Sequence, residues 1–564
     1  MSKTLARIVF ALTGCFFAAF FLWPILQIMK GGFIDADGRV TLAYLTALLT
    51  DPVYLGGLRN SFLLACATTT MALLLAMPLA FISDRFLFPG KTLLGSLILI
   101  PMILPPFVGA IGIKQIFGQY GAVNSLIISL GLRPGGWTFD WFAANQFWGV
   151  AVIQALSLYP IIYLNVVAAL ANVDPAMEEA AQNLGCTGFR RFWKITLPLI
   201  NPGLFAGGTI VFIWAFTELG TPLIFDYAQV TPVQIFYGLK DIGGNPFPYA
   251  LVAVMLASSV ALYAIGKGLF GRAHYAMMAK ATSSGGARAL PPGPRLLCTA
   301  FFAGVLTIAI LPHCGVILVA FSNDWYGTIL PQSYTLGNFQ MALGHDLTVS
   351  AIANSLKFAS IATLIDLILG IAIAYIVVRS QLPGRQLLDF LAMMPLAVPG
   401  LVLAFGYLAM SQEGRFFACI NPVKDPTILL IIAYSVRRLP YVVRSAAAGF
   451  QQTSETLEEA AQNLGCPPVK SLCKITLPLI AANLIAGGLL AFAFAMLEVS
   501  DSLVLAQKQL YYPITKAIME LFQLLGDGQF IASALGVWAM AFLGVTIVGL
   551  SFLLGKKLGA LFRV

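Results

Sequence analysis

The chain has 564 residues, of which 59% are hydrophobic and 10% are charged, and its mean hydropathy is +0.86. Soluble globular proteins carry about 25% charged residues, so the composition excludes a soluble enzyme and indicates an integral membrane protein. The net charge of +9 is explained by basic residues in the cytoplasmic loops of such a protein, and it requires no nucleic-acid partner.

Apolar runs long enough to cross a bilayer predict the transmembrane helices. In chain order they cover residues 5–29, 59–82, 93–117, 145–171, 197–223, 248–270, 297–320, 353–378, 386–410, 427–448, 477–503 and 530–555. The predicted fold class is therefore an all-α integral membrane protein with about twelve spans. When both termini are placed in the cytoplasm, the inner loops hold most of the 33 Lys and Arg residues, as the positive-inside rule requires. We expect a multi-pass protein of the bacterial inner membrane.

The second half of the chain repeats the first. Arg85 corresponds to Arg379 and Gly112 to Gly406, each in the same local context. Six predicted spans precede a segment rich in Gly, Ser, Pro and basic residues, and six follow it. Because six is even, the two repeats run in the same direction across the membrane. The prediction divides the chain into a first half, a cytoplasmic linker and a second half, at 1–270, 271–296 and 297–564.

A polar loop lies between the fourth and fifth predicted spans of each half. The segment EEAAQNLGC occurs unchanged at 178–186 and 458–466, and both copies lead into KITLPLI. Helix-start residues stand before the first copy, and Gly185 would end its helix. We therefore predict a short helix, a glycine-permitted bend and a second short helix at about 174–196 and again at about 454–476. Charged residues that repeat while the spans diverge favour a docking surface over a turn that only folding needs.

The spacing Glu179-Ala180-Ala181, Gly185 and Leu197-Pro198 resembles the cytoplasmic signature of binding-protein-dependent ABC importer permeases, and the second half repeats it. The resemblance covers nearly the whole chain. It implies that each loop forms a coupling helix seated in a separate ATPase subunit, two copies of which would bind. The residues expected to dock are Glu178, Glu179, Ala180, Ala181, Gly185, Arg190, Arg191, Glu458, Glu459, Ala460, Ala461 and Gly465.

Partners and cofactors follow from what the sequence contains. No Walker A motif occurs in it, so ATP and Mg²⁺ are expected on the partner ATPase, and the chain itself is expected to be no enzyme. We assign it no catalytic residue, no cofactor and no metal ligand. The outer loops reach only about 25–30 residues, too short for a solute-binding domain. The resemblance therefore implies an external solute-binding protein as a further partner, beside the lipid bilayer.

Ionisable residues inside the predicted spans are candidates for the translocation path, because charge is costly there. Arg437 and Arg438 lie in the tenth span, where they would either attract an anion or contact lipid headgroups and backbone carbonyls. Glu218 and Glu498 are a matched pair in the fifth span of each half, and Asp501 follows one helical turn after the second. These carboxylates would either contact a cation or pair with the arginines.

Fused two-half permeases of this kind resemble those for ferric iron, thiamine and 2-aminoethylphosphonate. The segments 218–222 and 437–440 are most similar to the iron and phosphonate branches. We expect ferric iron, with 2-aminoethylphosphonate as the alternative because the arginines favour an anion. A secondary transporter or channel that needs no ATPase is the alternative from another class, although it would not require twin docking loops.

Overall fold

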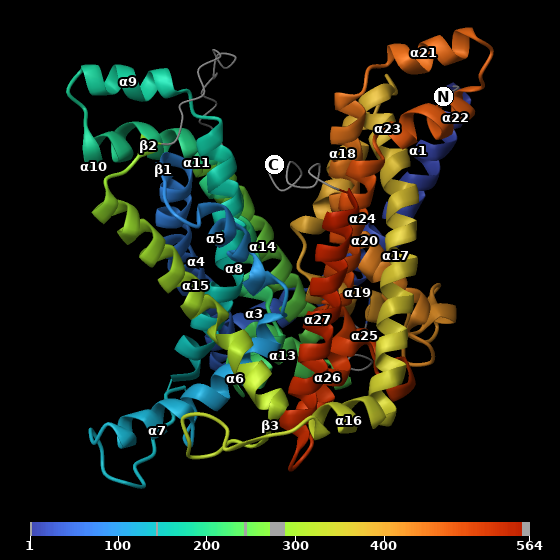
Figure 1. The fold of residues 1–564 in the computed structure, drawn as a ribbon. Helices are drawn as coiled ribbons and strands as arrows, with labels where there is room; N and C mark the ends of the chain where they lie inside the picture. Colours follow the sequence, from blue (N-terminus) through green and yellow to red (C-terminus); the bar gives the residue numbers. More distant parts are fainter. Residues whose placement is uncertain (1–2, 36, 143–144, 242–244, 271–287, 555–564) are drawn as a thin grey trace. The chain divides into compact units, whose positions relative to one another are not determined.

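The computed structural model describes residues 3–35, 37–142, 145–241, 245–270 and 288–554 (Figure 1). The described residues are mostly helical, which confirms the predicted all-α class. They form two compact units. Unit 1 takes the described residues of Met1–Gly57, Thr231–Ala257 and Phe339–Leu561, and unit 2 takes those of Leu58–Val230 and Ser258–Asn338. Most of the predicted linker, at 271–287, and the end of the last predicted span, at residue 555, lie outside the described residues.

Unit 2 is built mainly from the first sequence half. Its helices are α4 (Pro52–Arg85, whose first residues belong to unit 1), α5 (Lys91–Leu97), η2 (Ile100–Met102), α6 (Pro106–Phe117), α7 (Ala122–Ser129), α8 (Gln146–Ala171), α9 (Pro175–Asn183), α10 (Gly188–Arg191), η4 (Phe192–Thr196), α11 (Leu197–Thr217), α12 (Gly220–Ile224) and α15 (Pro292–Phe321). Strands β1 (Phe86–Leu87) and β2 (Arg288–Ala289) pair in parallel, and β3 (Ser322–Asp324) pairs antiparallel with β4 (Ser333–Tyr334).

Unit 1 is built mainly from the second sequence half. Its helices are α1 (Lys3–Phe17), η1 (Ala18–Leu22), α2 (Trp23–Phe33), α3 (Ala43–Thr50), α13 (Thr231–Gly238), η5 (Leu239–Asp241), most of α16 (Gly337–Gly344), α17 (Asp346–Arg379), α18 (Arg385–Met393), η6 (Met394–Leu396), α19 (Gly400–Met410), η7 (Ala418–Ile420), α20 (Thr427–Gln452), α21 (Thr456–Asn463), α22 (Pro468–Ser471), η8 (Leu472–Thr476), α23 (Leu477–Leu479), α24 (Ala481–Met496), α25 (Ser500–Leu505), η9 (Gln509–Tyr511), α26 (Ile514–Phe522) and α27 (Gly528–Leu554). Helix α14 (Phe247–Phe270) is divided between the units.

The described residues contain eight helices long and apolar enough to cross a membrane, or up to eleven if three bent helix pairs are each one span. These account for every predicted span except 427–448. That segment is α20, which has 26 residues but carries Arg437, Arg438 and Arg444. The predicted spans at 93–117, 386–410 and 477–503 are each a helix pair that bends by more than 40° at a short break.

Prolines explain two of these bends. The third span of the first half turns by 96° between residues 102 and 106, and that of the second half turns by 102° between residues 396 and 400. Pro105 and Pro399 hold the same extended backbone at the break, with ψ of 139° in both. Proline has no N–H to donate and clashes with the preceding helical turn, so the helix stops and restarts there. Both prolines were visible in the sequence repeat.

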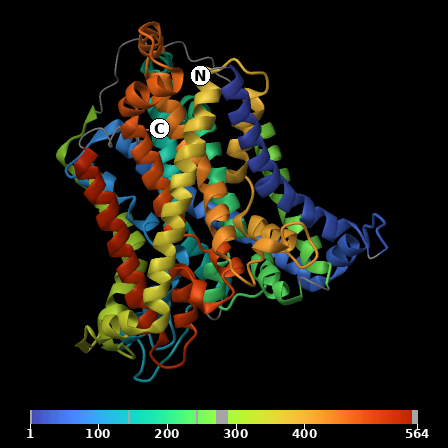
Figure 2. The ribbon, with the colours of Figure 1, turned by 90° about the vertical axis from the view of Figure 1, so that its right-hand side faces the viewer.

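The first helices of the two sequence halves are exchanged between the units. Helices α1 and α2 pack with α17 and α19 in unit 1 (Figure 2). The Tyr407 hydroxyl of α19 donates to the Phe20 carbonyl at 2.7 Å. Helix α15 packs on α6 in unit 2. A Cβ atom at Gly406 would lie 2.8 Å from Pro24 Cβ, and one at Gly112 would overlap the Val316 amide nitrogen. The matched glycines therefore permit both close contacts between helices. Because these two helices are exchanged, the boundaries of the compact units do not coincide with those of the sequence halves.

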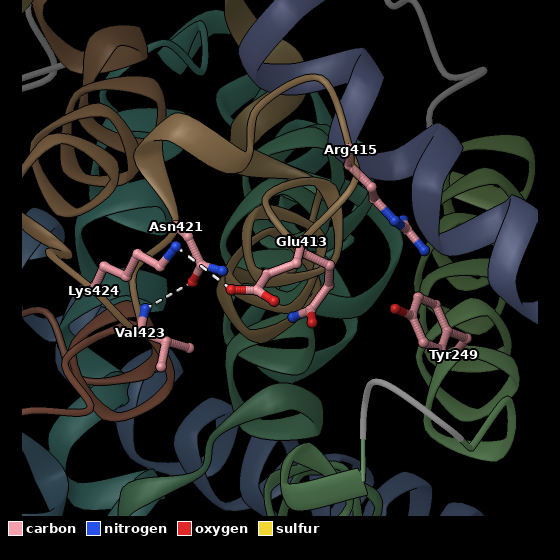
Figure 3. A pocket seen from close by; sticks show the side chains of 7 residues that line it. Tyr249, Glu413, Arg415, Asn421, Val423 and Lys424 are labelled. Carbon is pink, nitrogen blue, oxygen red and sulfur yellow. Dashed lines mark hydrogen bonds and ion pairs between the residues drawn. The ribbon is translucent and has the colours of Figure 1, made fainter.

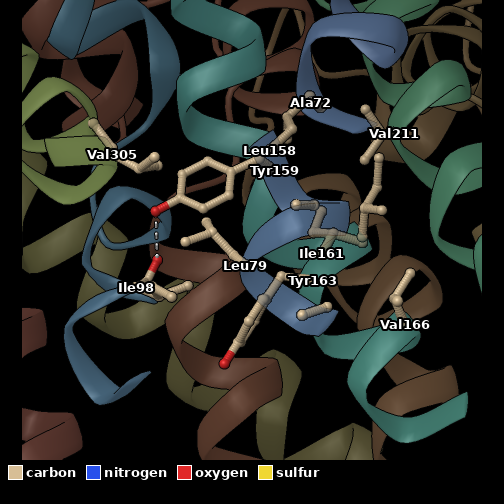
Figure 4. Close-up of a cluster of buried hydrophobic side chains, with 14 of the residues drawn as sticks. Ala72, Leu79, Ile98, Leu158, Tyr159, Ile161, Tyr163, Val166, Val211 and Val305 are labelled. Atoms are coloured by element: carbon tan, nitrogen blue, oxygen red, sulfur yellow. Dashed lines mark hydrogen bonds between the residues drawn. The ribbon is translucent and has the colours of Figure 1, made fainter. Parts of the chain in front are cut away.

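An extensive apolar core lies in unit 2, where side chains from α4, α8, α11 and α15 meet (Figure 4). Tyr159 lies fully buried at its centre, and its hydroxyl donates to the Ile98 carbonyl at 3.4 Å. Close packing of this kind holds helices together in a membrane, where lipid removes most of the hydrophobic driving force. The core fixes α8 and α11, and these are the two helices that carry the first polar loop.

Candidate functional site

The first polar loop is a helix–turn–helix made of α9 and α10, at one end of unit 2 (Figure 1). The Asp174 carboxylate accepts the Ala176 N–H at 2.9 Å and caps the start of α9. At the other end, the Cys186 N–H donates to the Ala181 carbonyl and the Gly185 N–H donates to the Gln182 carbonyl, both at 2.9 Å. This pair of bonds is a Schellman motif, which needs a left-handed residue, and Gly185 has φ of +80°.

The second loop repeats this geometry in unit 1 with α21 and α22. The Cys466 N–H donates to the Ala461 carbonyl at 3.0 Å, and the Gly465 N–H donates to the Gln462 carbonyl at 2.9 Å. Gly465 has φ of +84°. The predicted pattern of a short helix, a glycine bend and a second short helix is therefore confirmed in both halves.

A buried glutamate fixes the base of each loop. In unit 2, Glu178 accepts from Thr196 and from Arg85 at the end of α4, both at 2.7 Å. In unit 1, Thr476 donates to Glu458 at 2.9 Å. Arg379, at the end of α17, lies 3.7 Å from Glu458. Each cluster ties the loop to the ends of two other helices, so that the loop and these helices would move together.

The second cluster contains more groups than the first. The Tyr375 hydroxyl donates to Glu458 at 3.3 Å, and Arg379 also pairs with Glu455 at 3.2 Å. Sequence reasoning missed the anchoring role of the arginines, threonines and Tyr375. The signal was present for Arg85 and Arg379, which are matched residues at the ends of matched spans.

The residues predicted to dock separate into two groups. Glu178 and Glu458 are buried and bonded within the chain, so they face inward. Ala181 is buried and Ala461 is half-buried, while Arg191 is partly covered and donates to Gln182 at 3.1 Å. The exposed residues are Glu179, Ala180, Gly185, Arg190, Glu459, Ala460 and Gly465. A residue outside the prediction also stands out, because Leu184 and its counterpart Leu464 are 87% and 90% exposed.

The matched glutamate of the fifth span stands at a helix break in both halves. In unit 2, α11 ends at Thr217, and the Glu218 carboxylate accepts the N–H groups of Gly220 and Thr221 at 2.9–3.1 Å. It therefore caps the start of α12, where a negative charge is favourable. Gln154 donates to it at 3.4 Å. No arginine takes part in these bonds.

The corresponding break in unit 1 carries a charged network. Arg437 Nη1 lies 2.6 Å from Glu498 and 3.4 Å from Asp501, and Arg438 pairs with the other Glu498 oxygen. Of the two alternatives that the sequence left open for these carboxylates, this conformation shows the pairing with arginines. Two positive and two negative charges neutralise one another, as burial in a membrane requires.

A second buried acid lies beside this network. The Ser435 hydroxyl donates to Asp366 at 2.6 Å between α20 and α17. The matched positions in the first half are Ala72 and Ala155, which carry no polar group. At these two positions, the buried polar groups therefore belong to the second sequence half alone. Among the described residues, no group of three or more His, Cys, Asp or Glu side chains could hold a metal ion.

A polar pocket of about 420 Å³ lies in unit 1, between the start of α14 and the segment that joins α19 to α20 (Figure 3). Arg415 and Tyr249 point toward one another on one side of it. On the other side, Lys424 pairs with Glu413 at 3.4 Å, and both side chains are exposed. Helix α20 separates this pocket from α21, so it lies at the end of unit 1 opposite the polar loop.

Comparison with known proteins places these features in a family context. Residues 40–274 and 366–557 match the family model of the binding-protein-dependent transport system inner membrane component. A putative ferric transport system permease protein, FbpB 1 of Haemophilus influenzae, is 28% identical over 498 residues, which is 85% of this chain and 75% of that protein. The ferric transport system permease protein FbpB of Actinobacillus pleuropneumoniae is 26% identical over 466 residues; this chain covers 64% of its length, just under two thirds. The sulfate transport system permease protein CysT of Salmonella typhimurium is 28% identical over 247 residues, 43% of this chain and 86% of that protein.

Proposed function

The chain belongs to the family of binding-protein-dependent transport system inner membrane components, and from that premise we propose that it is the membrane-spanning permease subunit of an ABC importer. It passes a small solute, delivered by an external binding protein, into the cytoplasm. ATP is hydrolysed by two copies of a separate ATPase subunit, so the chain is no enzyme and binds no cofactor itself. On this proposal it lies in the bacterial inner membrane, and both termini are cytoplasmic.

The observation that carries the proposal is the pair of anchored loops. Each presents the same exposed residues, among them Glu179 and Glu459, on a helix whose base is fixed by a buried glutamate and arginine. A rigid, exposed, duplicated surface suits two copies of one partner. If closure of the ATPase pair favours one state of the permease, the loops transmit that preference through their different contact energies in the two states.

We propose ferric iron as the solute. Two relatives that align over more than four fifths of this chain are named ferric transport permeases. In this conformation, Arg437 and Arg438 are neutralised by Glu498 and Asp501, so they offer no net positive charge to an anion.

The second candidate is an anionic solute such as 2-aminoethylphosphonate. It is favoured by the presence of two buried arginines in the tenth span and by the similarity of part of the chain to a sulfate permease. It requires the arginines to release their carboxylates when the solute enters. Direct measurement of uptake distinguishes between the two candidate solutes.

The test is uptake by proteoliposomes that contain the full chain, the ATPase subunit and the external binding protein, with ATP inside. We expect ATP-dependent uptake of labelled ferric iron, and little uptake of labelled thiamine or 2-aminoethylphosphonate. Equal uptake without the ATPase subunit would instead indicate a secondary transporter or a channel.

A charge reversal at the loops tests the docking role. Glu179→Lys combined with Glu459→Lys should lower both ATPase retention and uptake at least about tenfold, an interaction loss of 1.4 kcal/mol. The matched control is Glu413→Lys, which reverses an exposed charge at the opposite end of unit 1. The control should leave ATPase retention unchanged. Full retention by the double variant, at normal protein yield, would contradict the assignment of the loops.

A further inference from the structure

The two loops differ at the start of their second helix, although the stretch before it is identical. Phe189 and Trp193 in the first loop are 75% and 54% exposed. Their counterparts in the second loop are Val469, which is 49% exposed, and the exposed Cys473. The first loop therefore offers two large aromatic surfaces where the second offers two small side chains.

The aromatic side chains of the first loop form one cluster. The rings of Phe189 and Trp193 lie 5.8 Å apart, edge to face. Phe192 lies beneath them, 6.4 Å from Phe189 and 5.4 Å from Phe81 of α4. The exposed rings are therefore held in place by a ring from the body of unit 2. Rings that are already ordered lose less conformational entropy when a partner covers them.

The charges of the two loops indicate the same kind of partner at both. The exposed Glu179, Arg190 and Lys194 correspond to Glu459, Lys470 and Lys474, and the sign of the charge is kept at each position. Leu184 and Leu464 are matched and exposed as well. Two copies of one ATPase subunit have identical docking grooves, and each groove would meet the same charges at either loop. The exposed aromatic surface is the largest difference between the two loops, and the replacement of Arg191 by Ser471 is a further one.

We propose that the two loops bind their ATPase copies with unequal affinity. The first loop, through Phe189 and Trp193, holds its ATPase copy more tightly than the second loop does. The inference rests on the proposed function. Tryptophan and other large aromatic side chains are enriched among the residues that dominate binding energy at interfaces. The Arg191–Gln182 hydrogen bond adds to this difference, because it joins α9 to α10, while the corresponding residue in the second loop is the buried Ser471. The permease would thus keep one ATPase copy while the other exchanges.

Contact with lipid headgroups is the other use for exposed aromatic residues near a membrane. Both loops return to a span on the same predicted side, so a general need for aromatic anchoring would place rings in both. The second loop has none at the matched positions. The observations therefore favour a protein partner for Phe189 and Trp193.

An exchange of residue types between the loops tests the inference. One variant carries Phe189→Val and Trp193→Cys, which gives the first loop the residues of the second. The reciprocal variant carries Val469→Phe and Cys473→Trp. Phe416→Val, at an 85% exposed site beyond the other end of α20, is the matched control. Each full chain is placed in lipid nanodiscs, and its affinity for the purified ATPase subunit that supports uptake is measured by titration.

We expect the wild-type chain to bind two copies with affinities that differ at least about tenfold. The first variant should lose the tighter step and the reciprocal variant should tighten the weaker one, while the control changes neither. A gain of affinity in the reciprocal variant cannot come from misfolding, so the test does not depend on the loss in the first variant alone.

Equal affinities in the wild type, or twofold or smaller effects in both variants, would overturn the inference. An altered association with lipid at unchanged ATPase affinity would overturn it in favour of membrane contact. If the wild-type chain binds no ATPase, the proposed function fails as well.

Discussion

The break in the fifth span uses different chemistry in the two halves of the chain. Before α12, Glu218 is held by backbone N–H groups and an amide. Before α25, the matched Glu498 is held by two guanidinium groups, and Asp501 adds a second carboxylate. The positions that match Arg437, Arg438 and Asp501 are Ser157, Leu158 and Thr221.

This difference distinguishes the residue that the helix break requires from the charged residues that are present only in the second half. The glutamate stands at the break in both units, so ending one helix beside the next is its shared role. The arginines are absent from unit 2, where the same break forms, so the fold does not require them. A buried ion network usually adds little stability compared with apolar packing. We infer that the network in unit 1 serves the solute path or its gating.

The largest effect should come from removing the central carboxylate of the network. Glu498→Gln removes the carboxylate that pairs with both Arg437 and Arg438 and leaves Asp501 paired with Arg437 alone, at a cost of about 3–5 kcal/mol. Glu218→Gln keeps one acceptor for the α12 cap and should cost about 1 kcal/mol. Thermal unfolding in detergent should therefore show a much lower midpoint for the first variant. Equal midpoints would show that the two breaks do not differ energetically.

Giving the second break the chemistry of the first separates stability from transport. The variant combines Tyr434→Gln, Arg437→Ser, Arg438→Leu and Asp501→Thr, and it keeps Glu498. Stability should change by less than about 2 kcal/mol, because both arginines are removed together with Asp501, and Glu498 is given the kinds of donor that hold Glu218. ATPase retention should persist, while uptake in proteoliposomes falls at least about tenfold, or 1.4 kcal/mol. Normal uptake would mean that the charges have no part in the solute path.

The loop anchors should show their effect in coupling rather than in docking. Glu178→Gln weakens a charge-assisted bond to Arg85 and should cost about 1.5–3 kcal/mol locally. The loop would still bind its partner but would pull less firmly on α4 and α11. We expect the ratio of ATP hydrolysed to solute imported to be severalfold higher for this variant than for the wild type.

A double-mutant cycle supplies the control for the anchors. Arg85→Met combined with Glu178→Met should cost less than the sum of the two single changes, because both members of the buried pair are removed together and only the partly exposed Asp84 loses a partner. Glu458→Gln should have an effect similar to that of Glu178→Gln, since Arg379 keeps its pair with Glu455 and Arg85 keeps its pair with Asp84, both at 3.2 Å. Strict additivity at Arg85 and Glu178 would show that the ion pair does not act as one unit.

Local signals in the sequence were sufficient for the loops. The Schellman turn at Gly185 and the cap at Asp174 depend on neighbouring residues, so the helix–turn–helix could be predicted from a short segment. The same local view misassigned Glu178 to the exposed surface. Its partner Arg85 lies 93 residues earlier in the chain, and identity between repeats does not distinguish an anchored residue from a docking residue.

Longer-range features could not be obtained from periodicity. An apolar run across Pro105 has the composition of one span, although the helix turns by 96° there. The exchange of α1 and α15 between the units depends on close contacts at Gly112 and Gly406. The sequence showed that these glycines match, but only the structure shows which helix approaches each of them.

The smallest expected effect concerns the glycines of the two loops. A Cβ atom at Gly185 or Gly465 would meet no atom within 4 Å, so substitution acts through the backbone alone. Alanine in the left-handed conformation costs about 1–2 kcal/mol, and asparagine costs less because its side chain can bond locally. Gly185→Ala should therefore weaken ATPase binding in nanodiscs about five- to thirtyfold, and Gly185→Asn should retain most of it. If the two loops bind the ATPase with unequal affinity, Gly465→Ala affects only the weaker of the two binding steps. Equal binding by the alanine and asparagine variants would show that the bend does not set the position of the docking helix.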